Sequence, residues 1–387
     1  MQAATQMTSE ALFQRCAERA PIYDRENRFF TEDFEELRVA GYLLMPIPSE
    51  LGGWGMTLPE VCREQRRLAY HAPATALGLN MHLYWLGLAA DLRRAGDHTL
   101  DWMLREGAAG EVFAAGHAET GNDIPVLLST AKAERVDGGY RFYGHKHFGS
   151  LSPVWTRLGL HAMDTSDPAA PKVVHAFVPR GTPGYRIEET WDVMGMRATR
   201  SDDTILDGVV ASASRIARVL PAGPPNDPFV DGIFSSAIPP IAAVYYGIAK
   251  RAFDIAVEGA KRRVSPALNG KTYAYHPATQ LAVSQAAIEL DSIWALLDRV
   301  ANEWTAGVDH GPLWPAKLLG AKQHAVDGAR RVVDLATKIA GASSLFRKNE
   351  LERLTRDVRS GPFHPPNTDA THDVIGKTYL GVLGEPA

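Results

Sequence analysis

Hydrophobic positions recur with a helical period towards both ends of the chain. Apolar residues return about every 3.6 positions in five segments: 10–13, 34–39, 242–261, 279–305 and 317–339. This spacing is typical of amphipathic helices. Residues 75–87 are instead apolar on nearly all sides, which predicts a helix at the centre of its domain.

The middle of the chain, from about residue 112 to 220, has short strand-like runs separated by Gly and Pro. The runs 132–136 and 140–144 flank Asp137-Gly138-Gly139, a sequence that favours a β-hairpin. Further runs follow at 173–178, 185–187 and 204–206. The pattern predicts a small antiparallel barrel or sandwich, ended by a Pro-rich linker at 220–225.

Together these patterns predict an α+β multidomain protein. We expect an N-terminal all-α domain at 1–112, a central antiparallel β-barrel or sandwich at 113–222, and a C-terminal four-helix bundle at 223–387.

The end of the chain contains a predicted turn between helices. One helix should end near Gly341, a second should cover 350–357, and a last should begin near Thr368. Proline cannot continue a helix, so the prolines around His364 predict a bent connection that carries this histidine.

Composition narrows the class of protein. Hydrophobic residues make up 45% and charged residues 22%, and the net charge of −4 gives no reason to expect nucleic acid or an anionic membrane as partner. Cys16 and Cys62 are too few for a disulfide framework, which fits a reducing compartment. The first residues do not resemble a signal peptide, and no stretch approaches the roughly 20 apolar residues of a membrane span. We therefore expect a soluble, cytoplasmic protein.

Common motifs do not reveal the chemistry. The 13 histidines are scattered, without His-Glu-x-x-His or Cys-x-x-Cys spacing, so no metal site is expected. A nucleophile elbow and Gly-rich phosphate loops are missing as well. Spacing alone indicates a soluble chain of enzyme size.

Five segments in order resemble the acyl-CoA dehydrogenase superfamily of flavoproteins over nearly the whole chain. They are LRVAGYLLMPIPSELGGWGM, GHAETGND, GHKHFGSLS, MGMRATRSDDTIL and GASSLFRKNELERLTRD. They are similar, respectively, to the family's N-terminal leader, its flavin loop, its Gly-x-Lys-x-Trp-x-Thr-Asn strand, its Gly-x-Arg strand and its Gly-Gly-x-Gly … Arg-Asp helix pair.

This resemblance implies FAD, with FMN as the alternative, between the β-domain and the bundle. Phe148 matches the residue that packs on the isoalloxazine, Ser150 the hydroxyl that bonds flavin N5, and Glu119 the loop at the pyrimidine end. Arg263 matches an arginine that reaches the pyrophosphate of a partner subunit, where a planar guanidinium suits a diphosphate. Gly341 would let the dinucleotide of the partner approach the backbone. The resemblance therefore also implies a homodimer or homotetramer.

The resemblance defines the reaction less well than it defines the cofactor. The family oxidises acyl thioesters by hydride transfer to flavin N5 while a Glu takes the α-proton, and burial raises the pKa of such a base. Counting from Arg356-Asp357 puts Pro365 at the position of this Glu, and the alternative position on the first bundle helix also has no carboxylate. A dehydrogenase of this kind, acting on an acyl-CoA and passing electrons to an electron-transfer protein, would need Asp369 or His364 as its base.

A second branch of the same fold resembles the chain differently. The two-component flavin monooxygenases of the dibenzothiophene monooxygenase type use a histidine in a His-x-Pro turn, a histidine on the apolar N-terminal helix and a hydroxyl near N5. His364, His82 and Ser150 match these places. They would surround a flavin C4a-hydroperoxide in a dry pocket, with a flavin reductase as partner and a small molecule as substrate. A catalytically silent flavin- or CoA-binding member is the third alternative. All three are compatible with the missing Glu, and the two enzymes share the class of flavin-dependent oxidoreductase.

Overall fold

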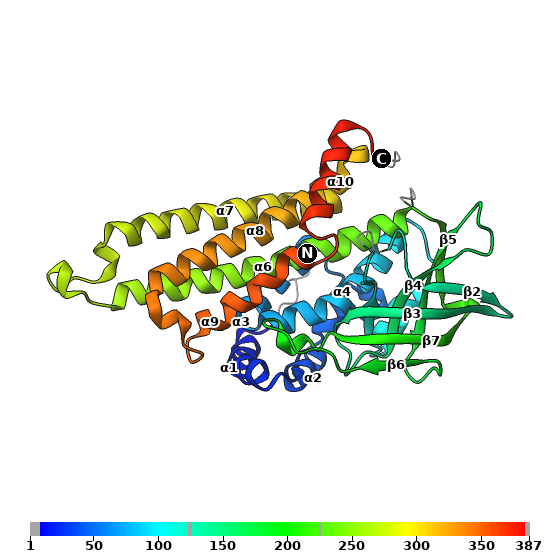
Figure 1. The fold of residues 1–387 in the computed structure, drawn as a ribbon, viewed down its shortest axis with the longest axis horizontal. Coiled ribbons are helices and arrows are strands. Elements are labelled where there is room, and N and C mark those ends of the chain that lie inside the picture. Colours follow the sequence, from blue (N-terminus) through cyan, green and yellow to red (C-terminus); the bar gives the residue numbers. More distant parts are fainter. Residues whose placement is uncertain (1–7, 123–125, 224–226, 384–387) are drawn as a thin grey trace.

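The computed structural model describes residues 8–122, 126–223 and 227–383. Helices come first, a sheet follows, and long helices return at the end (Figure 1). The order agrees with the predicted α+β architecture. The first helices are α1 (Glu10–Glu26), α2 (Thr31–Val39), α3 (Leu58–His71), α4 (Pro73–Arg94) and α5 (Asp101–Ala108).

The N-terminal helices begin and end where local chemistry directs them. Gly41, which follows the C-cap residue Ala40 of α2, adopts a left-handed φ of 80°. Thr57 with Glu60 forms a capping box at the start of α3. Helix α4 contains the apolar run 75–87 and is buried, as predicted.

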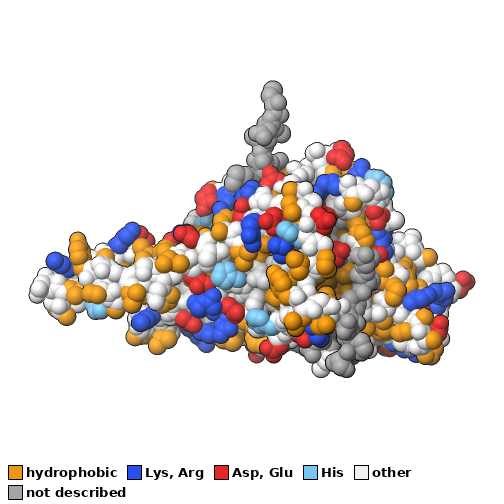
Figure 2. Space-filling view, turned by 90° about the horizontal axis from the view of Figure 1, so that it is seen from above, with side chains coloured by type: hydrophobic (Ala, Val, Ile, Leu, Met, Phe, Trp, Pro, Cys, Tyr) orange, Lys and Arg blue, Asp and Glu red, His pale blue; other side chains and the backbone are white. Residues whose placement is uncertain are grey.

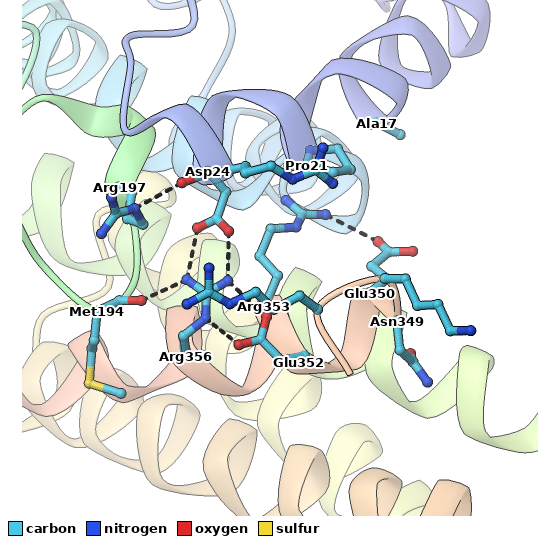
Figure 3. Close-up of a pocket in the computed structure, with 13 residues that line it drawn as sticks. Ala17, Pro21, Asp24, Met194, Arg197, Asn349, Glu350, Glu352, Arg353 and Arg356 are labelled. Atoms are coloured by element: carbon cyan, nitrogen blue, oxygen red, sulfur yellow. Dashed lines mark hydrogen bonds and ion pairs between the residues drawn. The ribbon is translucent and has the colours of Figure 1, made fainter. Parts of the chain in front are cut away.

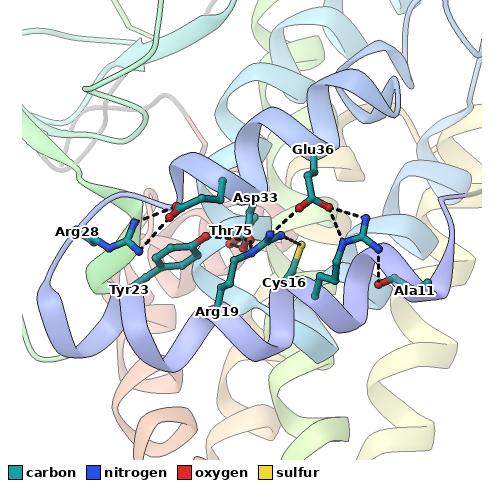
Figure 4. A network of polar contacts seen from close by, with 10 residues as sticks. Ala11, Cys16, Arg19, Tyr23, Arg28, Asp33, Glu36 and Thr75 are labelled. Carbon is teal, nitrogen blue, oxygen red and sulfur yellow. Dashed lines mark hydrogen bonds and ion pairs between the residues drawn. The ribbon is translucent and has the colours of Figure 1, made fainter.

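A buried carboxylate joins the first helices to α4. Asp33 on α2 accepts hydrogen bonds from Arg19 Nε (2.6 Å), Tyr23 Oη (3.1 Å) and Thr75 Oγ1 (3.1 Å) (Figure 4). Burial raises the pKa of Asp33 to about 6 although Arg19 opposes the shift. Three donors from α1 and α4 thus offset part of the cost of burying this group.

The central segment forms one eight-stranded sheet in the order β6-β7-β3-β2-β4-β5-β8, with β1 beside β4. The predicted hairpin is confirmed as β2 and β3 around the turn at 137–138. The strands pair antiparallel except that β1 runs parallel to β4 and β2 makes one parallel pair with β4. Parallel neighbours need a long connection, and local alternation does not reveal them. The strands are β1 (Phe113–Gly116), β2 (Lys132–Val136), β3 (Gly139–Gly149), β4 (Arg157–Asp164), β5 (Lys172–Pro179), β6 (Tyr185–Glu188), β7 (Asp202–Ser212) and β8 (Ile216–Pro221).

The C-terminal helices are α6 (Pro228–Arg262), α7 (Pro277–Thr305), α8 (Trp314–Ala340), α9 (Glu350–Asp357) and α10 (Thr368–Leu380). Helix α6 begins well before the predicted 242 because it continues through Pro239 and Pro240. Both prolines are buried in a helix that packs against α3, α4 and α8, and this packing compensates for the backbone hydrogen bonds that the prolines cannot make. Helices α9 and α10 begin where the sequence predicts.

The bundle extends beyond the C-terminal segment. Helices α6, α7 and α8 lie side by side, α10 packs on one end of α8, and α3 and α4 of the N-terminal segment pack against α6 (Figure 1). Because helices from both ends share this core, the division at 112/113 and 222/223 stays a prediction.

Contrary to the expectation that no stretch approaches a membrane span, helix α6 is long and apolar enough to cross a membrane by length and composition. Within the fold 83% of its most apolar window is buried. Packing against α3, α4 and α8 therefore accounts for its apolar character.

Candidate functional site

A cavity of about 340 Å³ lies between α4, the first half of α6, the end of β3, the loop 191–201 and the His364 turn. Most of its lining is apolar, and its polar side chains are neutral hydroxyls and imidazoles. No Asp, Glu, Lys or Arg is present among the described residues that line it. The lining includes Leu77, Met81, Tyr84, His117, Phe148, Ser150, Trp191, Met194, Thr199, Ser201, Phe234, Ile238, Ile241, Phe363 and His364.

Large apolar side chains at this cavity are unusually exposed. The exposed fractions are 61% for Phe148, 59% for Met194 and 76% for Phe363. Phe148 has a left-handed φ of 56° and meets Trp191 edge to face, with ring centroids 6.0 Å apart. A non-glycine residue with positive φ is held there by its surroundings. These rings offer a platform that a flat aromatic ligand would cover, so the cavity fits the ring system of a flavin.

A chain of hydroxyl groups enters the cavity from Ser150. Ser150 Oγ is 2.7 Å from Ser201 Oγ, which is 2.8 Å from Thr199 Oγ1. Thr199 in turn donates to the carbonyl of Met196 at 2.9 Å. Because a carbonyl only accepts, Ser201 must donate to Thr199 and Ser150 to Ser201. Ser150 therefore presents lone pairs to the cavity and suits a ligand N–H.

His364 is half-buried, and its Nε2 lies 2.6 Å from the hydroxyl of the buried Tyr245. Burial, together with the nearby Lys322 ammonium, lowers the pKa of His364 to about 3, so the ring is neutral near pH 7. If Tyr245 donates to Nε2, the phenol proton is satisfied and the ring proton lies on Nδ1. In this tautomer Nδ1–H is the donor that remains for a ligand.

The turn that carries His364 is held by a buried lysine. Lys322 Nζ on α8 donates to the carbonyls of His364 (3.0 Å) and Pro366 (2.7 Å). Burial lowers the pKa of Lys322 to about 8. Lys322 was not among the predicted site residues, although a lysine four positions after Leu318 and four before Val326 interrupts a buried stripe of α8.

The loop between Met194 and Arg197 is held by the Arg-Asp pair of α9. Arg356 donates to the carbonyl of Met194 at 2.7 Å, and Asp357 Oδ1 accepts from the N–H of Met196 at 2.7 Å. A Cβ at Gly195 would lie 2.5 Å from the Arg356 carbonyl, so this close approach requires glycine. Arg356 and Asp357 belong to one of the segments that resemble the family, and the structure shows that this pair positions one wall of the cavity.

A second, strongly charged cavity of about 320 Å³ lies between α1, α9 and the same loop (Figure 3). Three of its arginines form ion pairs within the chain: Arg197, Arg353 and Arg356. Arg356 pairs with Asp24 (2.6 Å) and Glu352 (2.8 Å). Met194 borders both cavities. We interpret the ion pairs as anchors of α9 on α1.

Glu119 is buried, but its side chain does not line the first cavity. Its carboxylate pairs with the Lys146 ammonium and accepts from Ser129 Oγ (2.5 Å) and the N–H of Thr130 (2.8 Å). Burial opposes ionisation, yet Lys146 and these donors hold the pKa of Glu119 below its usual value. Glu119 thus holds residues 129–131, directly before β2, while its neighbour Ala118 lines the cavity.

His82 does not reach the cavity, in contrast to the expectation from the monooxygenase branch. Its Nε2 lies 3.1 Å from the Leu43 carbonyl, and its Nδ1 accepts from the N–H of Phe113 at 3.1 Å. Burial lowers the pKa of His82 to about 4. With both ring nitrogens bonded to backbone, His82 joins α4 to its neighbours and has a structural role.

Asp369 is exposed on the first turn of α10 and is not among the residues that line the cavity. The Asp369 carboxylate therefore lies outside the cavity and is not placed to act as a base on a substrate bound there.

Arg263 and Gly341 meet at the other end of the bundle. The Arg263 guanidinium donates to the carbonyls of Ile339 (2.8 Å) and Ala340 (2.7 Å) and stacks on Tyr273. Gly341 has a φ of 69°. Arg263 follows Ile241 by 22 residues along α6, or roughly 33 Å at 1.5 Å per residue. Both residues therefore lie well away from the cavity described above.

Tyr245, Thr199, Ser201 and His117 also contribute to the site but were not predicted. His117 lies within the recognised GHAETGND segment and lines the cavity. Thr199 and Ser201 lie within the MGMRATRSDDTIL segment. Only Tyr245, on an apolar helix, carries no signal in the sequence.

Comparison with known proteins identifies the family of the chain. A family profile described as the C-terminal domain of acyl-CoA dehydrogenase matches residues 240–366. The chain is 31% identical to the putative acyl-CoA dehydrogenase YdbM of Bacillus subtilis, over 92% of this chain and 91% of the relative. It is 27% identical to the dibenzothiophene monooxygenase of Rhodococcus erythropolis, over 92% and 89%. The structure of a KijD3 in complex with FMN and dTDP-3-amino-2,3,6-trideoxy-4-keto-3-methyl-D-glucose superposes with a TM-score of 0.84 at 26% identity, covering 96% and 92% of the chains. The chain belongs to the acyl-CoA dehydrogenase superfamily of flavoproteins.

Proposed function

We propose that the protein is a flavin-dependent monooxygenase that uses reduced flavin and dioxygen on a small, largely apolar substrate. One observation carries the proposal. The described lining of the cavity contains hydroxyls and imidazoles but no carboxylate to take an α-proton. A relative named dibenzothiophene monooxygenase over almost the full chain supports the same class.

The cavity residues would hold the flavin ring as follows. Phe148 and Trp191 form an apolar rim for the isoalloxazine, and Ser150 accepts a hydrogen bond from a ring N–H. Reduced flavin carries a proton on N5 that oxidised flavin lacks, so an accepting Ser150 favours the reduced form. The family resemblance implies FAD as the cofactor, and the FMN-bound structure of KijD3 supports FMN as the alternative.

Bound reduced flavin supplies the electrons that activate dioxygen. Around it, His364 would donate Nδ1–H to an oxygen atom in the cavity, with its tautomer held by Tyr245. The apolar walls exclude water and so strengthen each of these hydrogen bonds. Lys322 and the Arg356-Asp357 pair act as positioning residues for the turn and the loop.

Acyl-thioester dehydrogenation is the second candidate because the relative at 31% identity carries that name. Its base would have to be His364 or Asp369. The accepting nitrogen of His364 is occupied by Tyr245, and Asp369 is outside the cavity, so the geometry favours the monooxygenase.

We also propose that the chain works as a homo-oligomer. Large hydrophobic side chains are exposed on the narrow end of the bundle (Figure 2), and they include Val264, Tyr275, Leu281 and Ile288. Arg263 and Gly341 lie at the same end. A second subunit placed there would cover the apolar surface and bring its flavin to these residues.

The test uses the full chain with photoreduced FMN or FAD under anaerobic conditions. We expect reduced flavin to bind more tightly than oxidised flavin, and Ser150→Ala to lose this preference by roughly three- to tenfold. On mixing with oxygen, bound flavin should show an absorbance phase that free flavin does not. His364→Ala should keep flavin bound but lose that phase, while His324→Ala on α8 should behave as wild type. Anaerobic bleaching of bound oxidised flavin by an acyl-CoA would instead establish the dehydrogenase. Absence of binding in both redox states would refute the proposal.

A further inference from the structure

Two histidines point to the same side of the sheet just before the cavity. His145 and His147 lie two positions apart on β3, so their side chains share a face. Strand β7 runs beside them, with Thr204 opposite Lys146 and Ile205 opposite His145. The irregular pairing that follows brings the next residue, Asp203, against both imidazoles.

The three side chains converge on one point. Asp203 Oδ2 is 2.8 Å from His145 Nε2 and 2.9 Å from His147 Nδ1, and the two imidazole centroids are 3.9 Å apart. The side-chain exposed fractions are 44% for His145, 22% for His147 and 13% for Asp203. The carboxylate is therefore largely covered, while solvent reaches the group through the histidines.

Other histidines of the chain contrast with this group. His310 pairs with Glu303 (2.9 Å), and His71 pairs with Glu10 (2.7 Å), one imidazole to each carboxylate. Across the described residues, the group of His145, His147 and Asp203 is the one in which three such ligand atoms lie within 4.8 Å of one another.

We propose that His145, His147 and Asp203 bind a divalent transition-metal ion of the zinc class. Bonds of roughly 2.0–2.2 Å would place neighbouring ligand atoms of a tetrahedron about 3.3 Å apart. The two N···O separations, now 2.8 and 2.9 Å, would have to widen by about half an ångström to admit the ion in place of the two ring protons that now face Asp203. Water would take the remaining position on the solvent side. Two imidazoles and one carboxylate form a donor set that zinc and its neighbours prefer.

A supporting hydrogen bond is already in place. His147 Nε2 lies 2.9 Å from Thr120 Oγ1. With Nδ1 on the metal, Nε2 carries the proton and donates to this hydroxyl, which is the outer contact that orients metal-bound histidines. The N–H of His147 also donates to the carbonyl of Ala118 at 2.9 Å. The ion would thus connect β3, β7 and the loop at 118–120.

The experiment measures zinc binding to the full chain after EDTA treatment and desalting. Zinc is titrated in competition with a chromophoric chelator, and cobalt(II) is added separately to read the ligand field from its visible spectrum. We expect one zinc per chain with a dissociation constant on the order of micromolar or tighter. His145→Ala and Asp203→Asn should each weaken binding at least about tenfold, and Thr120→Ala by a smaller factor.

His310→Ala removes an imidazole from a single His–carboxylate pair and is the matched control, with binding expected to be unchanged. Asp203→Asn retains the shape of the carboxylate and should fold normally. Thermal melting of each variant then shows whether weaker zinc binding comes from the missing ligand or from a loss of folding. Zinc binding that is equally tight in His145→Ala and Asp203→Asn, or no binding by the wild type, would overturn the proposal.

Discussion

The hydrogen bond between Tyr245 and His364 provides the sharpest test of the site. Tyr245→Phe deletes one oxygen atom that is 0% exposed and keeps the ring. The change removes the 2.6 Å contact and leaves His364 Nε2 without its donor. A net hydrogen bond contributes about 1 kcal/mol, and an unpaired buried acceptor costs roughly 1–3 kcal/mol. Because His364 is only half-buried, we expect the free energy of unfolding to fall by about 1–2 kcal/mol.

The functional effect of Tyr245→Phe should exceed its effect on stability. Without the phenol, the ring proton of His364 is no longer directed to Nδ1. We expect the rate of substrate oxygenation to fall by roughly ten- to a hundredfold, while flavin affinity changes little. Complete loss of general acid catalysis would cost roughly 10²–10⁴-fold, and the smaller effect is expected because the imidazole itself stays in place. Tyr246→Phe, the next residue on α6, is the control because its ring faces Trp294 instead.

Urea denaturation of Tyr245→Phe, His364→Ala and the double variant gives the coupling between the two side chains. Residues in direct contact couple by about 0.5–3 kcal/mol. A coupling below about 0.3 kcal/mol, together with an unchanged rate in Tyr245→Phe, would refute the assignment of the tautomer.

Two predictions concern the buried lysines. The folded pKa of Lys322, about 8, lies below its ordinary 10.5, so the unfolded chain binds more protons between these values and the free energy of unfolding rises with pH. Lys322→Met should remove this rise, which amounts to about 3 kcal/mol at roughly 1.4 kcal/mol per pKa unit. Unfolding curves measured from about pH 7.5 to about pH 10.5, roughly the range of the titration, test this prediction. If the stability of both proteins changes in parallel with pH, the prediction is wrong. Glu119→Gln leaves the Lys146 ammonium buried without its partner, so we expect a loss of about 3–5 kcal/mol in guanidinium denaturation. Glu134→Gln breaks the exposed Lys132–Glu134 pair and is the control, with little change in stability expected.

Much of the fold was accessible from local patterns. The 3.6-residue period located α7 and α8, the Asp-Gly-Gly turn located the β2–β3 hairpin, and the prolines located the turn at His364. Helix α6 was predicted too short because prolines usually end a helix. In the structure it continues through Pro239 and Pro240, since neighbouring helices pack around them.

The sequence by itself determined the order of the elements and, through five recognisable segments, the family. Both depend on residues near one another in the chain, where periodicity and turn chemistry act. The sequence did not separate His82 from His364, because each lies in a matching segment. Tertiary structure gives His82 two backbone partners, Leu43 and Phe113, and gives His364 a phenol and an open cavity.

The same limit explains the group on β3. His145 and His147 were counted among scattered histidines because the third ligand, Asp203, follows His147 by 56 residues. Only the pairing of β3 with β7 brings the three together. The chemistry of a side chain depends on its burial and its partners, and most of these partners come from distant segments that no local pattern records.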